Sequence, residues 1–374
     1  MCEDRLPIIR PTLPSLGELT ETLRESWNTG VVTVGKVVRD FETEACRKTG
    51  ARHAVGFASC TSGLMLVPKA LGLKAGGEVI VPSFTFAATA QALVWNGLVP
   101  VFCDCLPGTL TLDPEEAERN ITAKTVAICP VYIFGLPPDI DPLLDVGRRK
   151  GVPVYFDSAQ GLGATYRGRP AGGFSVCEVF SMSPTKVVTA VEGGLVTTND
   201  GVLAERLRAL RDYGKDPGNP ENMAYLGLSA RMSELHAAVA LLSLRRIDEL
   251  VKARVERIAL YRERLGRLAG CSVQKFPSDR TTSGNYFVLF VSDRAKRSRD
   301  ELYAELKARG IQTKRYFYPP VHEHTIFRDY PMRVSSRMEN TRRASAEGLA
   351  LPLYSHMTAG QQERVMAAIE EVQS

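Results

Sequence analysis

EVFSMSPTK (residues 178–186) places a lysine directly after a short, largely apolar run. The run EVFSMS has the length of one strand, and such a run is typical of a parallel sheet that is covered on both faces. Lys186 follows the predicted strand, and its nearest neighbours are small residues and one proline. A lysine is normally solvated, so this position indicates a chemical role. A plain surface charge is the alternative that the stretch alone leaves open.

Six further runs of the same kind surround this stretch. They are AVGFAS (54–59), EVIVPS (78–83), PVFCDC (100–105), TVAICPVYI (125–133), PVYFDS (153–158) and GGLVTT (193–198). Most are rich in β-branched or aromatic residues, and segments of helical pattern such as residues 138–150 separate many of them. Strands that alternate with helices predict an α/β fold with a doubly wound, mostly parallel sheet.

The second half of the chain is predicted to build a smaller unit. Residues 231–268 follow the pattern of one long helix, which we expect to lead from a large domain (1–250) to a small C-terminal α/β domain (251–374). In the small domain we expect strands at 286–291 and 312–315 and helices at 299–309 and 360–372. Pro68 lies inside a predicted helix over 64–71, where it should cause a bend or an early stop.

Composition excludes several classes of protein. The chain has 374 residues, of which 44% are hydrophobic, and a net charge of +5, as in an ordinary globular protein. The basic run RAKRSR (294–299) contains no aromatic residue, so we interpret it as a solvated loop and expect no nucleic-acid partner. The longest apolar run, 126–136, is interrupted by Pro130 and falls short of the roughly 18 residues of a membrane span.

The eight cysteines form no CxxC pair and no Cys/His cluster with metal-ligand spacing. Eight in a chain of this length do not make a disulfide scaffold. The start, MCEDRLPIIRP, is charged and contains prolines, unlike a secretory signal. We therefore expect a reduced cytoplasmic protein without a bound metal.

Two other motifs lie at predicted strand ends. In FDSAQ (156–160), Asp157 ends an apolar strand at the edge where open α/β sheets bind ligands; a helix N-cap is the alternative. In SCTSG (59–63), Thr61 and Ser62 open a helix and suit a phosphate group, although such residues are often only caps. No GxxxxGK[ST] loop is present, and no GxGxxG follows a strand.

Together the three motifs predict a pyridoxal phosphate site. Desolvation favours the neutral amine of Lys186, which is the form that attacks a carbonyl. Asp157 can pair with the pyridinium nitrogen, and the helix start at Thr61 can hold the phosphate. A carboxylate, a phosphate cradle and a reactive lysine in one α/β domain are the parts that this cofactor requires.

Over nearly its whole length the chain resembles the DegT/DnrJ/EryC1/StrS family of nucleotide-sugar aminotransferases, which are fold-type I pyridoxal phosphate enzymes. The segments that carry the resemblance follow one another in the family's order. They are IIRPTLP, TVGKVVRDFE, CTSGLML, VIVPSFTFAATAQA, FDSAQGLGATYRGRP, FSMSPTK, EGGLVTTND, RMSELHAA, RYFYPPVH and LALPLYSHMTAGQQERV.

The resemblance assigns roles to individual residues. Lys186 matches the lysine that carries the cofactor as a Schiff base, and Asp157 matches the partner of the pyridinium nitrogen. Gln160 matches a residue near the 3-oxygen of the ring. The phosphate would be bound by residues that match Thr61, Ser62 and Ser181.

Further matches concern the cofactor face, the substrate and the partner chain. Phe86 falls where the family stacks an aromatic ring on the cofactor, with plain core packing as the alternative. Ser183 stands where many relatives have histidine or an aromatic residue near the substrate. Ser229 replaces an asparagine that reaches the partner's cofactor phosphate in many relatives. The loop near the substrate would contain Tyr316, His322 and His324, although loop histidines are often merely solvated.

The resemblance implies a homodimer with shared active sites that moves an amino group from L-glutamate to a nucleotide-linked keto-deoxy sugar. The best match is C4 amination of dTDP-4-keto-6-deoxyglucose, and C3-aminating relatives share nearly all the same segments. Members that dehydrate their substrate have histidine in place of Lys186. A non-nucleotide cyclic ketone substrate, and a non-catalytic ligand sensor with the same fold, are the remaining alternatives; a sensor need not retain both Lys186 and Asp157.

Overall fold

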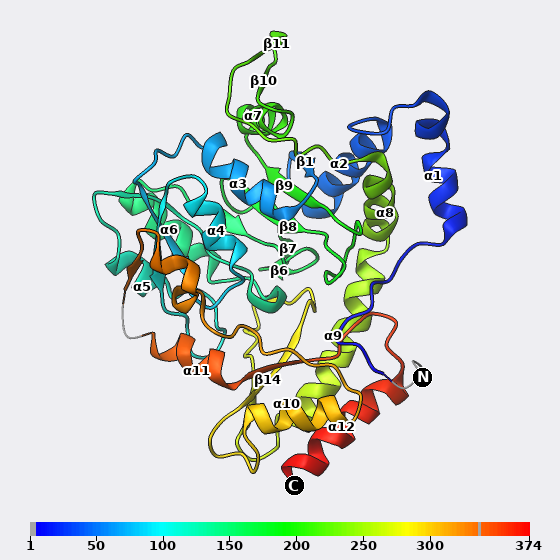
Figure 1. The fold of residues 1–374 in the computed structure, drawn as a ribbon, viewed down its shortest axis with the longest axis vertical. Helices are drawn as coiled ribbons and strands as arrows, with labels where there is room; N and C mark the ends of the chain where they lie inside the picture. The colour runs from blue at the N-terminus through cyan, green and yellow to red at the C-terminus, as the bar shows by residue number, and fades with distance from the viewer. Residues whose placement is uncertain (1–4, 336–337) are drawn as a thin grey trace.

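A wide sheet forms the centre of the fold in the computed structural model, which describes residues 5–335 and 338–374 (Figure 1). Cys2 lies outside the described residues. The strands of this sheet are β1 (His53–Phe57), β2 (Glu78–Pro82), β3 (Val99–Cys103), β4 (Thr125–Ile128), β5 (Phe156–Asp157), β8 (Glu178–Ser181), β9 (Gly194–Thr198) and β15 (Arg333–Val334).

The sheet has two four-stranded parts, with orders β1-β9-β8-β5 and β15-β3-β2-β4. Parallel bridges join them, because Tyr155 N donates to Ile128 O at 3.1 Å and Asp157 N donates to Pro130 O at 2.9 Å. Only β9 runs antiparallel to its neighbours, β1 and β8, among the pairs of this sheet in the described ranges. The predicted mostly parallel α/β sheet is therefore confirmed.

Helices cover both faces of the sheet, as the doubly wound prediction requires. Along β2 the side chain of Ile80 packs in one core, while Val79 and Val81 pack in the other. Helices α1 (Leu16–Thr29), α2 (Lys36–Thr49), α6 (Ile140–Lys150) and α8 (Glu234–Arg245) contribute to the first core. Helices α3 (Cys60–Ala70), α4 (Ala88–Val94) and α7 (Gly201–Arg211) contribute to the second. Strands buried on both faces explain why the seven runs lack polar alternation.

Pro68 lies inside α3 and is buried. The helix continues past the proline to Ala70, one residue short of the end predicted at residue 71, so the bend or early stop expected from Pro68 stays a prediction. The helix begins at Cys60, earlier than the predicted start at residue 64, because Ser59 caps its first turn.

The single helix predicted over 231–268 is wrong, since two helices occupy this segment. Helix α8 ends at Arg245 and α9 (Ile247–Leu265) begins after Arg246, whose φ of −96° and ψ of 9° are not helical. Apolar residues line one face of the segment on both sides of the break. Of these, Ile247 packs in the first sheet core and Ile258 packs in a third core near the C-terminus. Helix α9 thus connects the first sheet core to the C-terminal core.

The C-terminal part has its own antiparallel sheet of order β12-β14-β16, with bounds Cys271–Val273, Phe287–Val291 and Gly348–Leu351. Helices α10 (Arg299–Ala308) and α12 (Ala359–Gln373) pack beside it at the foot of Figure 1. The strand predicted over 312–315 is wrong: only single bridges form there, from Ile311 to Leu6 and from Lys314 to Ala350. The domain division at residue 250 stays a prediction.

Shorter elements complete the described chain. They are α5 (Pro114–Arg119), α11 (Glu339–Glu347), β6 (Thr165–Tyr166), β7 (Arg169–Pro170), β10 (Lys215–Asp216), β11 (Asn219–Met223), β13 (Arg280–Thr281) and three 3-10 turns, Ile133–Gly135, Val321–Glu323 and Thr325–Arg328. The β10–β11 hairpin projects from the top of Figure 1. Within residues 5–335 and 338–374, no helix is long and apolar enough to cross a membrane.

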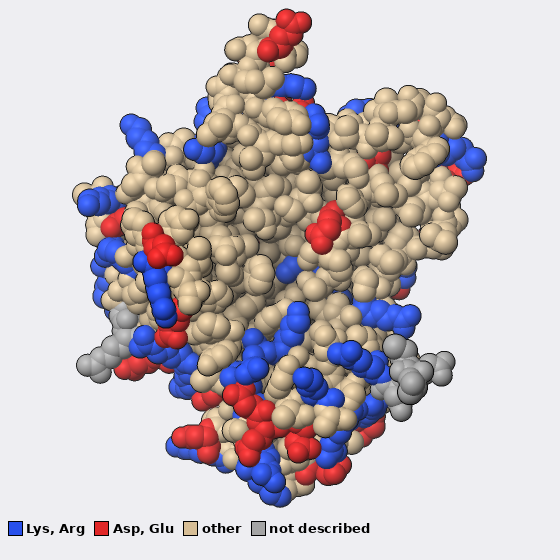
Figure 2. All heavy atoms as spheres, viewed as in Figure 1, with Lys and Arg blue, Asp and Glu red and all other residues tan. Residues whose placement is uncertain are grey.

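Charge is unevenly distributed over the surface. On the face seen in Figure 2, basic and acidic side chains crowd the C-terminal part at the bottom, whereas the sheet-bearing part above has wide uncharged areas. Large apolar side chains are also exposed, among them Leu16 (81%) and Trp27 (72%) on α1 and Leu226 (77%) before α8. Leu16 and Trp27 line one hollow on α1, and exposed apolar surface is often an interaction site.

Candidate active site

Most of the predicted site residues converge on one cavity of about 340 Å³. Asp157 and Ser181 stand at the ends of β5 and β8, and Lys186 follows β8. The C-terminal ends of parallel strands meet at one sheet edge, which brings residues that are distant in sequence together. The predicted residues that line the cavity are Thr61, Phe86, Asp157, Gln160, Ser181, Ser183, Lys186 and Tyr316.

Asp157 is a buried carboxylate held by two donors. Thr89 Oγ1 donates to Asp157 Oδ2 at 2.6 Å, and the Ala159 amide donates to Oδ1 at 3.0 Å. Burial raises the pKa of Asp157, while these two hydrogen bonds and the charge of Lys186 oppose that rise. No helix begins in residues 158–164, so the N-cap alternative for Asp157 does not hold.

Lys186 lies half-buried in the turn that follows β8. Its backbone N–H donates to Ser183 O at 3.0 Å, and its Nζ lies 5.8 Å from the centre of the Tyr286 ring. Among the described residues no carboxylate forms an ion pair with it. The amine therefore faces the cavity without a neutralising partner, as a reactive lysine requires.

The N-terminus of α3 forms another wall of the cavity. Ser59 caps the helix, and Ser62 Oγ is used in that cap because it donates to Ser59 O at 2.8 Å. Gly194 on β9 lets the two segments approach closely, since a Cβ there would lie 2.4 Å from Ser59 O. Thr61, in the first turn, is exposed and lines the cavity. Free N–H groups and the helix dipole suit an anion here.

Phe86 is 60% exposed in the loop between β2 and α4. Its ring contacts Phe317 at 6.4 Å between centroids. The exposure excludes plain core packing, which was the alternative for this residue, and leaves the ring free to cover a flat ligand.

Comparison with known proteins decides the family. The model of the DegT/DnrJ/EryC1/StrS aminotransferase family matches residues 16–370. The chain belongs to this family. It is therefore a pyridoxal phosphate-dependent sugar aminotransferase, and the predicted fold-type I architecture and cofactor are confirmed.

Three proteins are similar to this sugar aminotransferase over nearly their whole length. GDP-perosamine synthase of Caulobacter vibrioides is 35% identical over 92% of each chain. UDP-4-amino-4-deoxy-L-arabinose–oxoglutarate aminotransferase of Shewanella sediminis is 32% identical over 100% of this chain and 99% of the relative. The crystal structure of DesI with its TDP-sugar product is 36% identical, covers 99% of this chain and 93% of that one, and superposes with a TM-score of 0.91.

The cavity of this aminotransferase fits pyridoxal phosphate. Gln160 Oε1 is buried at the wall without a hydrogen-bond partner in the protein, and such an atom needs a ligand or water to satisfy it. Lys186, Asp157 and the N-terminus of α3 offer an amine, a carboxylate and an anion site around the same space. A volume of about 340 Å³ also lies in the range of small-molecule sites.

Four predicted residues do not line the cavity. Ser62 serves the α3 cap, and Ser229 is exposed beside Asp212 and Tyr213. His322 is buried and shares a 2.6 Å hydrogen bond with Ser83 through Nδ1. His324 Nε2 lies 3.1 Å from Pro319 O. The roles predicted for these residues stay predictions.

Sequence reasoning missed several residues of the site. Thr89 lies in the segment VIVPSFTFAATAQA, but only its bond to Asp157 reveals its role. Tyr286, Lys314 and Phe317 enter the cavity from the C-terminal part. No motif marks Tyr286, because an aromatic residue within a predicted strand (286–291) is typical of the core.

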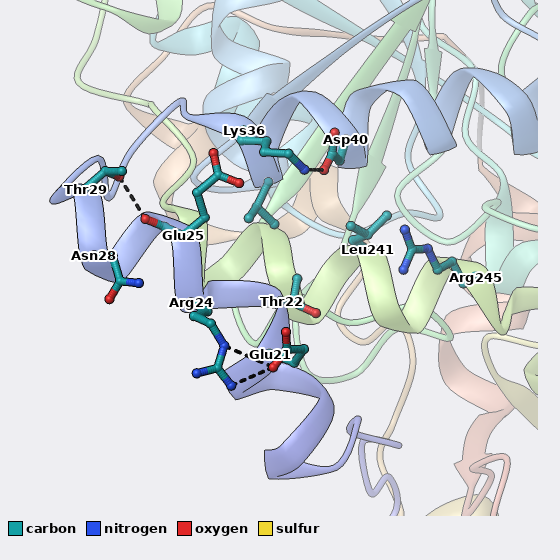
Figure 3. A pocket seen from close by; sticks show the side chains of 11 residues that line it. Glu21, Thr22, Arg24, Glu25, Asn28, Thr29, Lys36, Asp40, Leu241 and Arg245 are labelled. Carbon is teal, nitrogen blue, oxygen red and sulfur yellow. Dashed lines mark hydrogen bonds and ion pairs between the residues drawn. The ribbon is translucent and has the colours of Figure 1, made fainter.

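A larger cavity of about 510 Å³ lies between α1, α2 and α8 (Figure 3). Its charged side chains largely neutralise one another, as Lys36 pairs with Asp40 at 2.7 Å and Arg24 with Glu21 at 2.7 Å. None of the predicted site residues lines it. We therefore assign the smaller cavity as the active site.

Proposed function

We propose that this aminotransferase moves the amino group of L-glutamate to C4 of a nucleotide-linked keto-deoxy sugar, with dTDP-4-keto-6-deoxyglucose as the best candidate. The observation that carries the proposal is the single cavity that contains Lys186, Asp157, Gln160 and Ser181. The names of two relatives support the substrate class. The name of the Shewanella sediminis enzyme includes 4-amino-4-deoxy and oxoglutarate, and the DesI crystal structure contains a TDP-sugar product.

The nucleotide and the aminated carbon are separate parts of the proposal. The three similar proteins carry GDP, UDP and TDP in their names, so likeness to them does not favour one nucleotide. C3 amination is the alternative for the carbon. Ser183 lines the cavity two residues after Ser181, and we propose that this small side chain contributes to the choice of sugar.

The chain's own residues have separate tasks in the proposed reaction. When bound, pyridoxal phosphate supplies the carbonyl that takes up the amine and an electron-withdrawing ring. Lys186 holds the cofactor; once released, its amine takes a proton from the α-carbon of the donor, and in the second half-reaction delivers one to the sugar carbon. Asp157 favours a cationic ring nitrogen.

Other residues would bind and orient the cofactor. Thr61, Ser62 and Ser181 are assigned to its phosphate, where the N–H groups and dipole of α3 favour an anion. Gln160 is assigned to the 3-oxygen of the ring because its side chain lines the cavity and its NH2 group can donate to that oxygen. Phe86 would cover the ring and exclude water from it.

We further propose a homodimer with shared sites. Exposed apolar side chains on α1 and the segment before α8, such as Trp27 and Leu226, support an interface. Ser229 is exposed three residues after Leu226 and would be the residue that approaches the partner's cofactor phosphate. The cysteines in the described ranges are free, which suits the cytoplasmic location that we propose.

The experiment that tests the proposal is the visible absorption spectrum of the protein with pyridoxal phosphate, before and after L-glutamate. We expect glutamate to bleach the band of the lysine-bound cofactor, and keto sugars to restore it for the true substrate. Lys186→Ala should lack this band, while the control Lys69→Ala, exposed on α3, should behave as wild type.

Other outcomes would point to the alternatives. A band that glutamate leaves unchanged would show that the donor is wrong. A wild-type protein that binds the cofactor but restores its band with no keto sugar would favour a non-nucleotide ketone. Failure to bind the cofactor at all would favour the ligand sensor.

A further inference from the structure

Tyr286 is a buried phenol in the wall of the active site. It directly precedes β14 and is 7% exposed, and its ring centre lies 5.8 Å from Lys186 Nζ. An ammonium group is attracted to an aromatic ring at this distance. The lysine that is proposed to react therefore lies against one tyrosine from a different part of the fold.

The hydroxyl of Tyr286 belongs to a group of hydroxyls that extends from Lys186 toward solvent. The side chains of Thr185 and Tyr316 lie close enough to this hydroxyl to influence its ionisation. The rings of Tyr286 and Tyr316 meet edge to face at 5.1 Å. Lys314 Nζ, in turn, lies 3.4 Å from the Tyr316 hydroxyl and is exposed. Tyr316 and the exposed Lys314 thus lie on the side of Tyr286 that leads toward solvent.

The charges that face Tyr286 are positive. Lys186 faces it from the turn after β8, Lys314 from the segment beside β16, and Arg254 from α9. Arg254 is itself buried, and its guanidinium donates to Asn285 O at 3.3 Å. Although burial opposes ionisation, Lys186, the side chains of Thr185 and Tyr316, and Lys314 together lower the pKa of Tyr286.

We propose that Tyr286 is a further acid–base residue of this site, whose phenolic oxygen exchanges a proton with the amine of Lys186, directly or through one water molecule. In the forward step an N–H bond of the Lys186 ammonium breaks and an O–H bond forms on the Tyr286 phenolate; no electrons are transferred. The step matters because an ammonium group is neither a base nor a nucleophile. The inference rests on the proposed function of Lys186.

The first test uses the cofactor-free protein and the ultraviolet absorption of tyrosinate, titrated with pH. We expect one tyrosine of the wild type to ionise below the ordinary pKa of about 10. That step should disappear in Tyr286→Phe and move to higher pH in Lys186→Ala, because the neighbouring cation is gone. Tyr330→Phe, an exposed control, should keep it. An early step that persists in Tyr286→Phe would overturn the proposal.

The second test is the single-turnover rate with glutamate as a function of pH. Loss of a proton-transfer residue costs typically 10²–10⁴-fold in rate, so Tyr286→Phe should lose about that much near neutral pH and recover part of it at high pH. Its affinity for glutamate should stay within about twofold. A residue that only packs would leave the pH profile unchanged.

The two proposals can fail separately. If Lys186→Ala retains full activity, the proposed function fails, and this inference fails with it. If Lys186→Ala is inactive while Tyr286→Phe keeps the wild-type rate and pH profile, only the role of Tyr286 is refuted.

Discussion

Thr89 Oγ1 donates a 2.6 Å hydrogen bond to Asp157 Oδ2, across 68 residues of sequence. The bond connects α4, on one side of the cavity, to the end of β5. Because Asp157 is buried, the ionised carboxylate needs such donors to persist in the site. The carboxylate that is proposed to serve the cofactor is thus held in place by a residue outside the FDSAQ motif.

Thr89→Val should weaken cofactor binding, because it removes this donor while keeping the shape of the side chain. A hydrogen bond to a charged group is worth about 1.5–3 kcal/mol, so the dissociation constant for pyridoxal phosphate should rise by roughly 10–100-fold. Titration of cofactor-free protein followed by absorbance measures this. Thr22→Val, on exposed α1, is the control, and equal affinities of the two variants would contradict the prediction.

Asp157→Asn should stabilise the cofactor-free protein near pH 7 while it abolishes most activity. Burial raises the pKa of Asp157, so ionisation costs stability as pH rises from its ordinary pKa of about 3.9. The amide removes that cost, and Thr89 can rotate to accept from it. We expect a higher melting temperature for the variant than for wild type at pH 7.

The same comparison at about pH 2.5 provides the control, because wild-type Asp157 is then almost fully protonated in both the folded and the unfolded chain. The gain from Asp157→Asn should vanish there. A variant that melts below wild type at pH 7 would show that the buried charge is compensated.

Gly194→Ala should disturb the N-terminus of α3. The added Cβ would lie 2.4 Å from Ser59 O and 2.5 Å from Cys60 N, both backbone atoms that cannot move aside alone. Overpacking of this kind costs about 1–3 kcal/mol. Thermal unfolding should show the loss, and the affinity for the phosphate of the cofactor should fall.

Gly360→Ala is the matched control for this change, since nothing lies within 4 Å of a Cβ there. If Gly194→Ala unfolded less readily than Gly360→Ala, the close approach of β9 to α3 would not be a constraint.

His322→Asn should reduce stability rather than substrate affinity. His322 is buried against Ser83 and lies outside the cavity. Burial lowers its pKa, so its contribution is complete above the ordinary histidine pKa of about 6.5 and is lost as pH falls below it. The difference in unfolding free energy between wild type and variant, on the order of 2 kcal/mol at pH 8, should therefore shrink at pH 5.

Steady-state kinetics with the sugar substrate distinguishes the two roles of His322. An unchanged KM supports the structural role. A KM that rises several-fold, in a variant as stable as wild type, would instead support the substrate contact predicted from the loop sequence.

Much of the fold could be predicted because burial leaves a local pattern. Each central strand, such as β2 or β9, is buried along its whole length and reads as an apolar run. The break between α8 and α9 at Arg246 could not be predicted, because apolar residues with helical spacing, such as Leu244 and Ile247, continue on both sides of it. Likewise, residues 312–315 read as a strand but find only a single bridging partner in the C-terminal sheet.

The sequence by itself determined the α/β class, the motifs that follow each strand, and the candidate residues Asp157 and Lys186. Each of these depends on a short segment whose residues form a recognisable local pattern. Only the tertiary structure decided which side chains from other segments meet them. Thr89 and Tyr286 enter the cavity because parallel strands end at one edge and the C-terminal part packs over it. Contacts between distant segments depend on register and packing, which no local pattern encodes.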